Sequence, residues 1–170
     1  MKNIQSRRLA LLRLALVGSA VVLLSSCGFS LRGNASLPAE LQTLQVQSAD
    51  PNSDITRELR RVLRNNDVNV EEEQDSVYRL QVGQEQNSER ALSVNSQARA
   101  GEYQLTMSVP FQLLNASTPV LGPETITLER VYLADPENAA AKSDEARLIQ
   151  QEMRRELALQ ILRRLEAAKL

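Results

Sequence analysis

The sequence has no histidine, no tryptophan and only one cysteine in 170 residues. Without histidine the chain lacks the commonest general base of enzymes, and a lone cysteine cannot form a disulfide within the chain. A structural zinc site normally takes four cysteine or histidine ligands, which this composition cannot supply. No Gly-x-Ser-x-Gly motif of a serine hydrolase is present either. These absences favour a binding or structural protein over an enzyme, and they predict no metal and no other cofactor.

Aromatic residues and excess positive charge are also scarce. The chain has three tyrosines and two phenylalanines, and its 20 basic residues are balanced by 21 acidic residues. Domains that bind nucleic acid are usually basic and often use aromatic side chains to stack on bases. We therefore expect no nucleic-acid partner.

The N-terminus differs from the rest of the chain, because it carries cations without acids. Lys2, Arg7, Arg8 and Arg13 precede an uninterrupted apolar run, "LALVGSAVVLL", at 14–24. A positive head, a short apolar centre and small residues behind it are typical of a secretory signal peptide, assigned here to residues 1–26. The run is too short to span a bilayer, which takes about 20 apolar residues. The alternative is a buried helix of the folded domain.

The cysteine follows this apolar run directly. Leu24-Ser25-Ser26-Cys27 resembles the bacterial lipobox, in which the cysteine sulfur takes a diacylglycerol and cleavage occurs just before the cysteine. Several acyl chains anchor a protein durably, at about 0.8 kcal/mol per buried methylene. We therefore predict that Cys27 carries a covalent lipid and that residues 27–170 form one domain, with 27–40 as the lipidated tether or an entry strand. Gly28 after the cysteine favours the outer membrane, by analogy with Gram-negative lipoproteins.

The remaining chain alternates predicted strands and helices. Strands are expected at 41–48, at 78–82 with continuation toward 94, at 103–113 and at 124–133, with a hairpin loop at 115–123. In the strand at 103–113, apolar residues alternate from Tyr103 to Leu113. Pro110 cannot donate a ladder hydrogen bond and suggests an edge position or a bulge in its strand. The order β-α-β-β-β-α predicts an α+β fold without parallel βαβ units. We expect a single four-stranded, mostly antiparallel sheet with two helices packed on one face.

Both expected helices have an apolar face. In the first, Asn52 or Ser53 is the expected N-cap and Asn65-Asn66 the stop. The apolar face of this helix consists of Ile55, Leu59, Val62 and Leu63. Its arginines are interpreted as a solvated face, with an anion site as the alternative. The long C-terminal helix, capped by Ser143, places an apolar residue every four positions from Ile149 to Leu165, joined by Leu148, Ala158 and Leu162. Core packing of this helix is favoured over a position on the membrane surface.

Four segments, taken in order, resemble the lipopolysaccharide-assembly lipoprotein family LptE of Gram-negative bacteria. They are "CGFSLRG" behind the lipobox, "DPNSDITRELRRVLRNNDV", "AGEYQLTMSV", and the final "ADPENAAAKSDEARLIQQEMRRELALQILRRL". The resemblance covers nearly all of 27–165. It implies an outer-membrane lipoprotein that sits in the lumen of the β-barrel LptD as a plug. Such a protein helps that barrel assemble and helps deliver lipopolysaccharide to the outer leaflet.

The resemblance also implies candidate contacts with the phosphates of lipopolysaccharide. Lys142 matches the family's lysine in "AAAK". Arg99 lies in the loop before the central strand, where the family carries a basic residue, although the loop length differs and the family's Phe-Arg pair is missing here. Arg90 is a further candidate. Two alternatives to the plug are a free lipid-binding carrier lipoprotein, which would need a deep apolar cavity, and a lipid-anchored hydrolase.

Overall fold

The computed structural model describes residues 37–71, 77–94, 100–134 and 138–170. The candidates Cys27 and Arg99, the predicted signal peptide and most of the predicted tether lie outside these residues. The elements are a 3-10 turn Ala39–Leu41, strands β1 (Thr43–Ser48), β2 (Asn69–Glu71), β3 (Tyr78–Val82), β4 (Gln86–Val94), β5 (Ala100–Asn115) and β6 (Thr118–Leu133), and helices α2 (Asp54–Arg64) and α3 (Ala139–Glu166). None of the described helices is long and apolar enough to cross a membrane.

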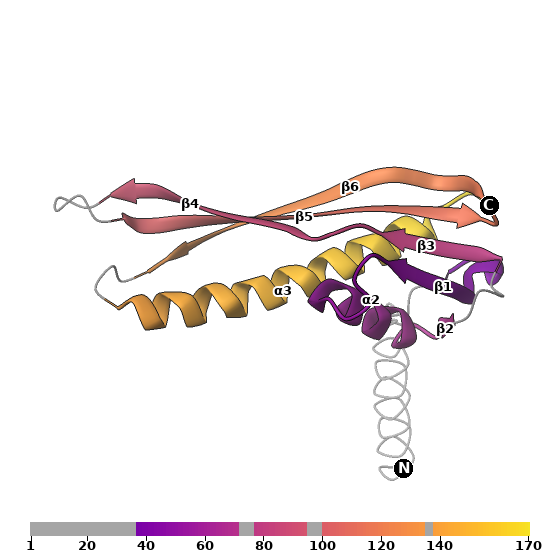
Figure 1. Ribbon diagram of the computed structural model, residues 1–170, viewed down its shortest axis with the longest axis horizontal. Coiled ribbons are helices and arrows are strands. Elements are labelled where there is room, and N and C mark those ends of the chain that lie inside the picture. The colour runs from indigo at the N-terminus through magenta and orange to yellow at the C-terminus, as the bar shows by residue number, and fades with distance from the viewer. Residues whose placement is uncertain (1–36, 72–76, 95–99, 135–137) are drawn as a thin grey trace, which may run out of the picture. The chain divides into compact units, whose positions relative to one another are not determined.

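The six strands form one mixed sheet in the order β2-β1-β3-β5-β4, with β6 on β5. The α+β class with two helices is confirmed, and Figure 1 shows α2 and α3 on the same side of the sheet. The predicted four-stranded, mostly antiparallel sheet is wrong in two respects. First, the prediction lacks β2, a three-residue strand with one buried side chain, Val70, which is too short to show an alternating pattern. In addition, β1 runs parallel to both β2 and β3, so that α2 is the crossover of a βαβ unit.

The segment predicted as one strand from 78 toward 94 is two strands, β3 and β4. Both pair antiparallel with β5, one after the other along the same side. Gly83 lies at the break, where its N–H donates to the carbonyl oxygen of Pro110 at 2.8 Å. A Cβ on Gly83 would lie 2.6 Å from Cγ of Pro110. Pro110, which has no N–H to donate, thus lies where the ladder of hydrogen bonds is interrupted. β5 is not an edge strand, but its pairing with β6 is irregular directly after Phe111.

The alternation predicted for β5 is confirmed. Its inward side chains are buried, among them Leu105, Met107, Val109, Phe111 and Leu113. The hairpin loop predicted at 115–123 is wrong, because β5 and β6 are joined by the two residues 116 and 117. Each of these two strands is 16 residues long, well above the usual five or six. They extend beyond β3 to carry β4 and the first turns of α3 (Figure 1).

Helix α2 begins and ends as its sequence predicts. Ser53 is the N-cap and accepts a hydrogen bond from the N–H of Thr56 at 3.4 Å, and Asn65 is the C-cap. Its predicted apolar face is buried. Helix α3, in contrast, begins four residues before Ser143, with Asn138 as its N-cap. Ser143 instead donates its hydroxyl to the carbonyl oxygen of Ala140 at 2.8 Å.

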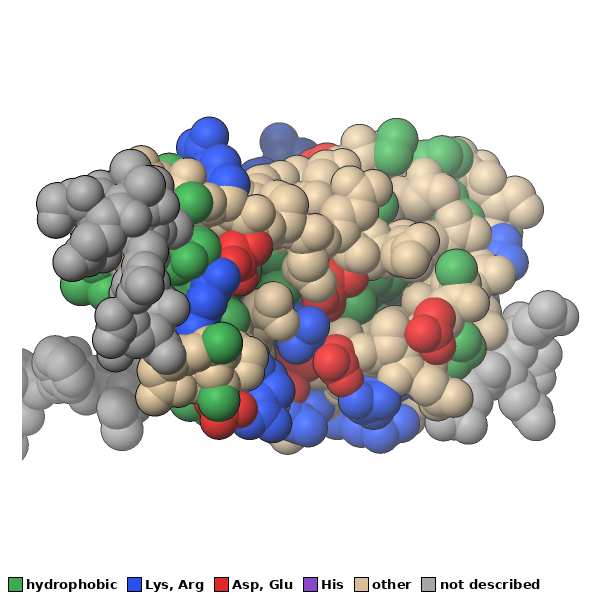
Figure 2. All heavy atoms as spheres, turned by 60° about the vertical axis from the view of Figure 1, so that its left-hand side comes forward, with side chains coloured by type: hydrophobic (Ala, Val, Ile, Leu, Met, Phe, Trp, Pro, Cys, Tyr) green, Lys and Arg blue, Asp and Glu red, His purple; other side chains and the backbone are tan. Residues whose placement is uncertain are grey.

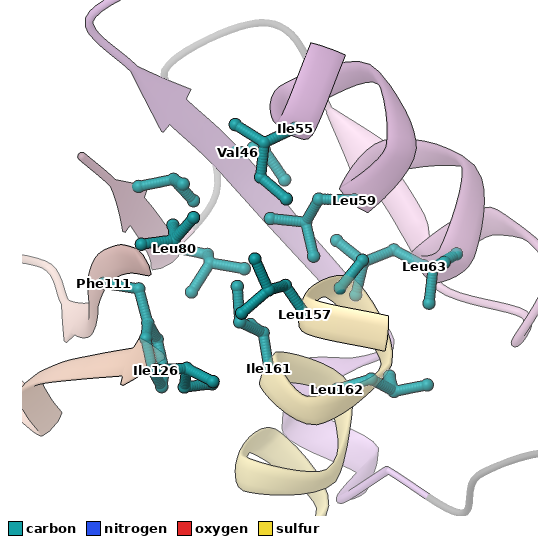
Figure 3. Packing of buried hydrophobic residues seen from close by; sticks show 14 of the residues in the cluster. Val46, Ile55, Leu59, Leu63, Leu80, Phe111, Ile126, Leu157, Ile161 and Leu162 are labelled. Carbon is teal, nitrogen blue, oxygen red and sulfur yellow. The ribbon is translucent and has the colours of Figure 1, made fainter. Parts of the chain in front are cut away.

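The core lies between the sheet and the two helices. Figure 3 shows Leu59 of α2 and Leu157 and Ile161 of α3 pointing toward Leu80 and Phe111 of the sheet. Packing of α3 against the sheet is confirmed for its predicted stripe, except that Leu148 is 60% exposed and Ile149 is only partly buried. Arg154 of α3 binds Glu85, between β3 and β4, at 2.9 Å and lies 3.5 Å from Asp54 of α2. This arginine therefore connects both helices with the break in the sheet.

Candidate functional site

Lys142 lies in the first turn of α3, under the far end of β4, β5 and β6. The side chain of Asn138 accepts from the N–H of Ala141 at 3.0 Å, and its carbonyl oxygen accepts from the N–H of Lys142 at 3.1 Å. This cap places the ammonium group against the inner face of the sheet. The Nζ atom of Lys142 lies 2.6 Å from Oε1 of Glu89 on β4 and 3.6 Å from the ring centroid of Tyr103 on β5.

A pair of tyrosines supports this contact. Tyr103 and Tyr132 are directly opposite each other on β5 and β6, and their rings stack with centroids 5.6 Å apart. The hydroxyl of Tyr132 donates to Oε2 of Glu89 at 3.1 Å. Both oxygens of Glu89 are thus occupied, one by an ammonium and one by a phenol. We call Glu89, Tyr103, Tyr132 and Lys142 the lysine cluster.

The cluster fixes the protonation states of two of its members. The hydrogen bond to Glu89 raises the pKa of Lys142 above its ordinary value and outweighs partial burial, which acts in the opposite direction. Burial raises the pKa of Tyr132 strongly, and the hydrogen bond to Glu89 adds to this. At neutral pH the cluster therefore holds a protonated lysine and a neutral phenol. The side chain of Lys142 is 27% exposed, so the cluster lies at the surface rather than in the core.

Arg90 does not join this cluster. It is paired directly with Gln104, whereas its neighbour Glu89 is paired with Leu105. Successive strand residues point to opposite faces, so Arg90 lies on the outer face of the sheet and Lys142 below the inner face. Two nitrogens of Arg90 donate to Oε1 of Gln104, at 2.7 and 3.0 Å. The two described candidates are therefore separated by the sheet, and the third, Arg99, is outside the described residues.

Sequence reasoning missed three of the four members of the lysine cluster. The sequence pattern places Tyr103 only among the alternating apolar residues of its strand and gives Glu89 and Tyr132 no role. Glu89 and Tyr132 are 43 residues apart and meet only through the register of β4, β5 and β6. A glutamate at an inward position of a strand is the one local signal that could have suggested a buried partner.

The outer face of the sheet carries many uncharged polar side chains. Gln112 donates to Gln81 at 2.6 Å and Gln81 donates to Gln47 at 2.9 Å, so that a row of amides crosses three strands. A hollow of about 430 Å³ adjoins this row. In Figure 2 tan side chains make up much of the upper part of the view, where Figure 1 has the sheet, with some blue side chains toward the upper left and green ones toward the upper right.

The helices present a different surface. A groove of about 660 Å³ between α2 and α3 is lined by Arg57, Arg61, Arg154 and Arg155, with Asp54, Glu58 and Glu152 among them. Figure 2 shows blue side chains gathered along the lower edge of the view. Arg57 and Arg61 form ion pairs with the acids three positions before them. These pairs favour the solvated helix face over an anion site. Within the described parts of the chain, no group of three or more acidic, cysteine or histidine residues could hold a metal ion.

Comparison with known proteins gives one consistent result. A model of the family "LptE: Lipopolysaccharide-assembly" matches residues 41–165. The chain is 32% identical to an LPS-assembly lipoprotein LptE of Pectobacterium atrosepticum and 35% identical to one of Photorhabdus laumondii. Each of these matches spans 88% of this chain and 82% of the relative. The fold is similar to the crystal structure of the rare lipoprotein B from Shewanella oneidensis, with a TM-score of 0.64 and 32% identity over 71% of this chain and 91% of that one.

Proposed function

Because this chain belongs to the LptE family of lipopolysaccharide-assembly lipoproteins, we propose that it is an outer-membrane lipoprotein that plugs the LptD β-barrel. In this role it supports assembly of the barrel and delivery of lipopolysaccharide to the outer leaflet. The family is not enzymatic, in agreement with the expectation from the missing histidine. The observation that carries the proposal is the extent of the family match, which runs from the 3-10 turn before β1 to the last turn of α3.

The surface of the domain supports a position inside a barrel lumen. The interior of a large outer-membrane barrel is polar, so a plug should be polar on all sides that meet the wall. Here the outer sheet face is rich in glutamine, and the helix face carries arginines paired with acids. Among the described residues, the large apolar side chains exposed on the strands are Leu92, Val131 and Leu133.

We assign the membrane anchor to Cys27. Lipidation at this position tethers the domain to the inner side of the outer membrane and raises its effective concentration near the barrel. Acyl chains on the cysteine also remove any need for a membrane-spanning helix.

Contact with lipopolysaccharide is assigned to Lys142 first. Its ammonium is charged, partly exposed and held in one place by Glu89 and Tyr103. Charge-assisted hydrogen bonds from such a group suit the phosphates of lipopolysaccharide. Arg90 is the weaker candidate, because two of its nitrogens already donate to Gln104. Arg99 remains a candidate from the sequence.

The carrier alternative gains no support from the fold. A carrier needs an apolar cavity that encloses acyl chains. The space between sheet and helices is filled by aliphatic side chains, with Leu59, Leu80, Leu113, Leu157 and Ile161 all 0% exposed. The hollow beside the glutamine row lies on the outer face and is lined in part by amides.

The proposal is tested by purifying the full chain from outer membranes in mild detergent, through a tag placed after Leu170. We expect a large β-barrel protein in near-equal amount. A variant with a disrupted core, Leu157→Asp, keeps the signal and Cys27 and should lose the barrel. Recovery of the intact chain alone would overturn the plug assignment.

A further inference from the structure

We propose that Glu89 is a built-in competitor for the charge of Lys142, which lowers the affinity of this site for phosphate groups. A phosphate of lipopolysaccharide then binds by sharing the ammonium with Glu89 or by displacing it. This inference rests on the proposed function, because it concerns the same lysine. It assigns Glu89 a role in selecting the ligand.

The geometry leaves room for a second anion on Lys142. An ammonium has three protons to donate. One direction is taken by Glu89 at 2.6 Å, and a second points to the ring of Tyr103 at 3.6 Å. The lysine side chain is 27% exposed, so it is not sealed off from solvent. A phosphate oxygen arriving at the ammonium lies close to the carboxylate of Glu89 as well.

The carboxylate cannot simply rotate away, because it is held from the other side. Tyr132 donates its hydroxyl to the second oxygen of Glu89 at 3.1 Å, and Tyr132 is itself buried and stacked on Tyr103. Glu145, on the helix turn after Lys142, adds a further negative charge near Tyr132. Lys142 on α3 and Tyr132 on β6 therefore hold the carboxylate of Glu89 in the unliganded chain.

The charges of the cluster decide what this arrangement does. Lys142 and Glu89 together are neutral, so a single small anion gains little from approaching them. Removing the carboxylate leaves one uncompensated positive charge above an aromatic face. For a partly exposed pair of this kind, we expect phosphate affinity to rise about three- to tenfold.

A consequence for selectivity follows. A ligand with one phosphate and no other contacts is rejected by Glu89. Lipopolysaccharide carries several phosphates and acyl chains, so its other contacts with the protein can offset the affinity lost to competition with Glu89. Inorganic phosphate should therefore compete poorly for the wild-type chain and better for a Glu89 variant.

The test measures binding of lipid A to the full chain in mild detergent, with the bisphosphorylated lipid and its dephosphorylated form as probes. Glu89→Gln and Glu89→Ala should each bind the bisphosphorylated lipid three- to tenfold more tightly, with a steeper loss of affinity as salt rises. Glu129→Gln is the matched control, because Glu129 is an exposed glutamate on the same sheet, paired with Thr106. It should stay within twofold of the wild type, and no variant should gain affinity for the dephosphorylated lipid.

A second pair of variants separates this inference from the proposed function. Lys142→Met should weaken binding, whereas Lys169→Met, beyond the end of α3, should not. If Lys142→Met weakens binding but neither Glu89 variant strengthens it, the competitor role is overturned and the lipid contact stands. If Lys142→Met binds like Lys169→Met, the lysine contact fails and this inference fails with it. If both Glu89 variants are unfolded by thermal melting, Glu89 is a structural brace and the competitor role is overturned.

Discussion

Lys142 owes its position to side chains from neighbouring strands rather than to its own helix. Its ammonium forms an ion pair with Glu89 and contacts the ring of Tyr103. The hydroxyl of Tyr132 donates a hydrogen bond to Glu89. The sequence could indicate Lys142 only by resemblance to a family, because none of its partners is near it in the chain. The fold thus gives this lysine a defined partner, Glu89, which we propose also competes with its ligand.

The cluster should make stability depend on pH in the alkaline range. The pKa values of Lys142 and Tyr132 are both raised in the folded chain. Groups with a raised folded pKa contribute stability that is complete below their unfolded pKa, about 10 for both, and is lost as pH rises through the folded value. We expect Lys142→Met to lower the free energy of unfolding by about 1 kcal/mol at pH 7.

This difference between wild type and Lys142→Met should stay constant from pH 7 to about pH 9 and shrink above pH 10. Urea unfolding at a series of pH values measures it. Tyr132→Phe should show the same trend. A difference of equal size at pH 7 and at pH 11 would contradict the assignment of the raised pKa values to this cluster.

At the scale of elements, sequence patterns predicted the features that depend on interactions within a single segment. The cap of α2, its buried face and the alternation of β5 all depend on residues within one segment, and they are confirmed. The parallel pairing of β1 and the break between β3 and β4 depend on contacts between distant segments. The break shows this best, because Gly83 meets Pro110, which lies 27 positions further along the chain.

We predict that Gly83→Ala destabilises the domain by about 1–3 kcal/mol. The new Cβ would lie 2.6 Å from the ring of Pro110, which has little freedom to move. Gly101→Ala is the matched control, since a Cβ there meets no atom within 4 Å and should change the free energy of unfolding by less than about 0.5 kcal/mol. Equal urea midpoints for the two variants would rule out a close contact at the break.

Arg154 and Arg155 are adjacent on α3 but should differ in their importance. The side chain of Arg154 is 13% exposed and binds Glu85, which is 11% exposed, so Arg154→Met leaves a nearly buried carboxylate without its partner. We expect a loss of about 2–3 kcal/mol, somewhat below the cost for a fully buried pair. Arg155 is exposed, and Arg155→Met should cost less than about 0.5 kcal/mol. Thermal unfolding compares the two, and similar losses would contradict the connecting role of Arg154.

At the scale of the whole domain, the two outer surfaces differ in chemistry. The sheet side carries a row of glutamines, and the helix side carries arginines paired with acids (Figure 2). The sequence names both Arg90 and Lys142 as candidates, and the register of the strands places them on opposite faces of the sheet. A domain that is polar on opposite sides suits an enclosing wall better than a single flat partner.

The most direct test of the plug assignment is photocrosslinking from opposite sides of the domain in intact cells. A photoreactive residue replaces Thr127, exposed on the sheet, or Arg61, exposed on α2, and the chain without a photoreactive residue serves as control. Because a barrel encloses its plug, we predict adducts with the barrel protein from both Thr127 and Arg61 and none from the control. Adducts from only one of the two sides, or from neither, would contradict a position inside the lumen.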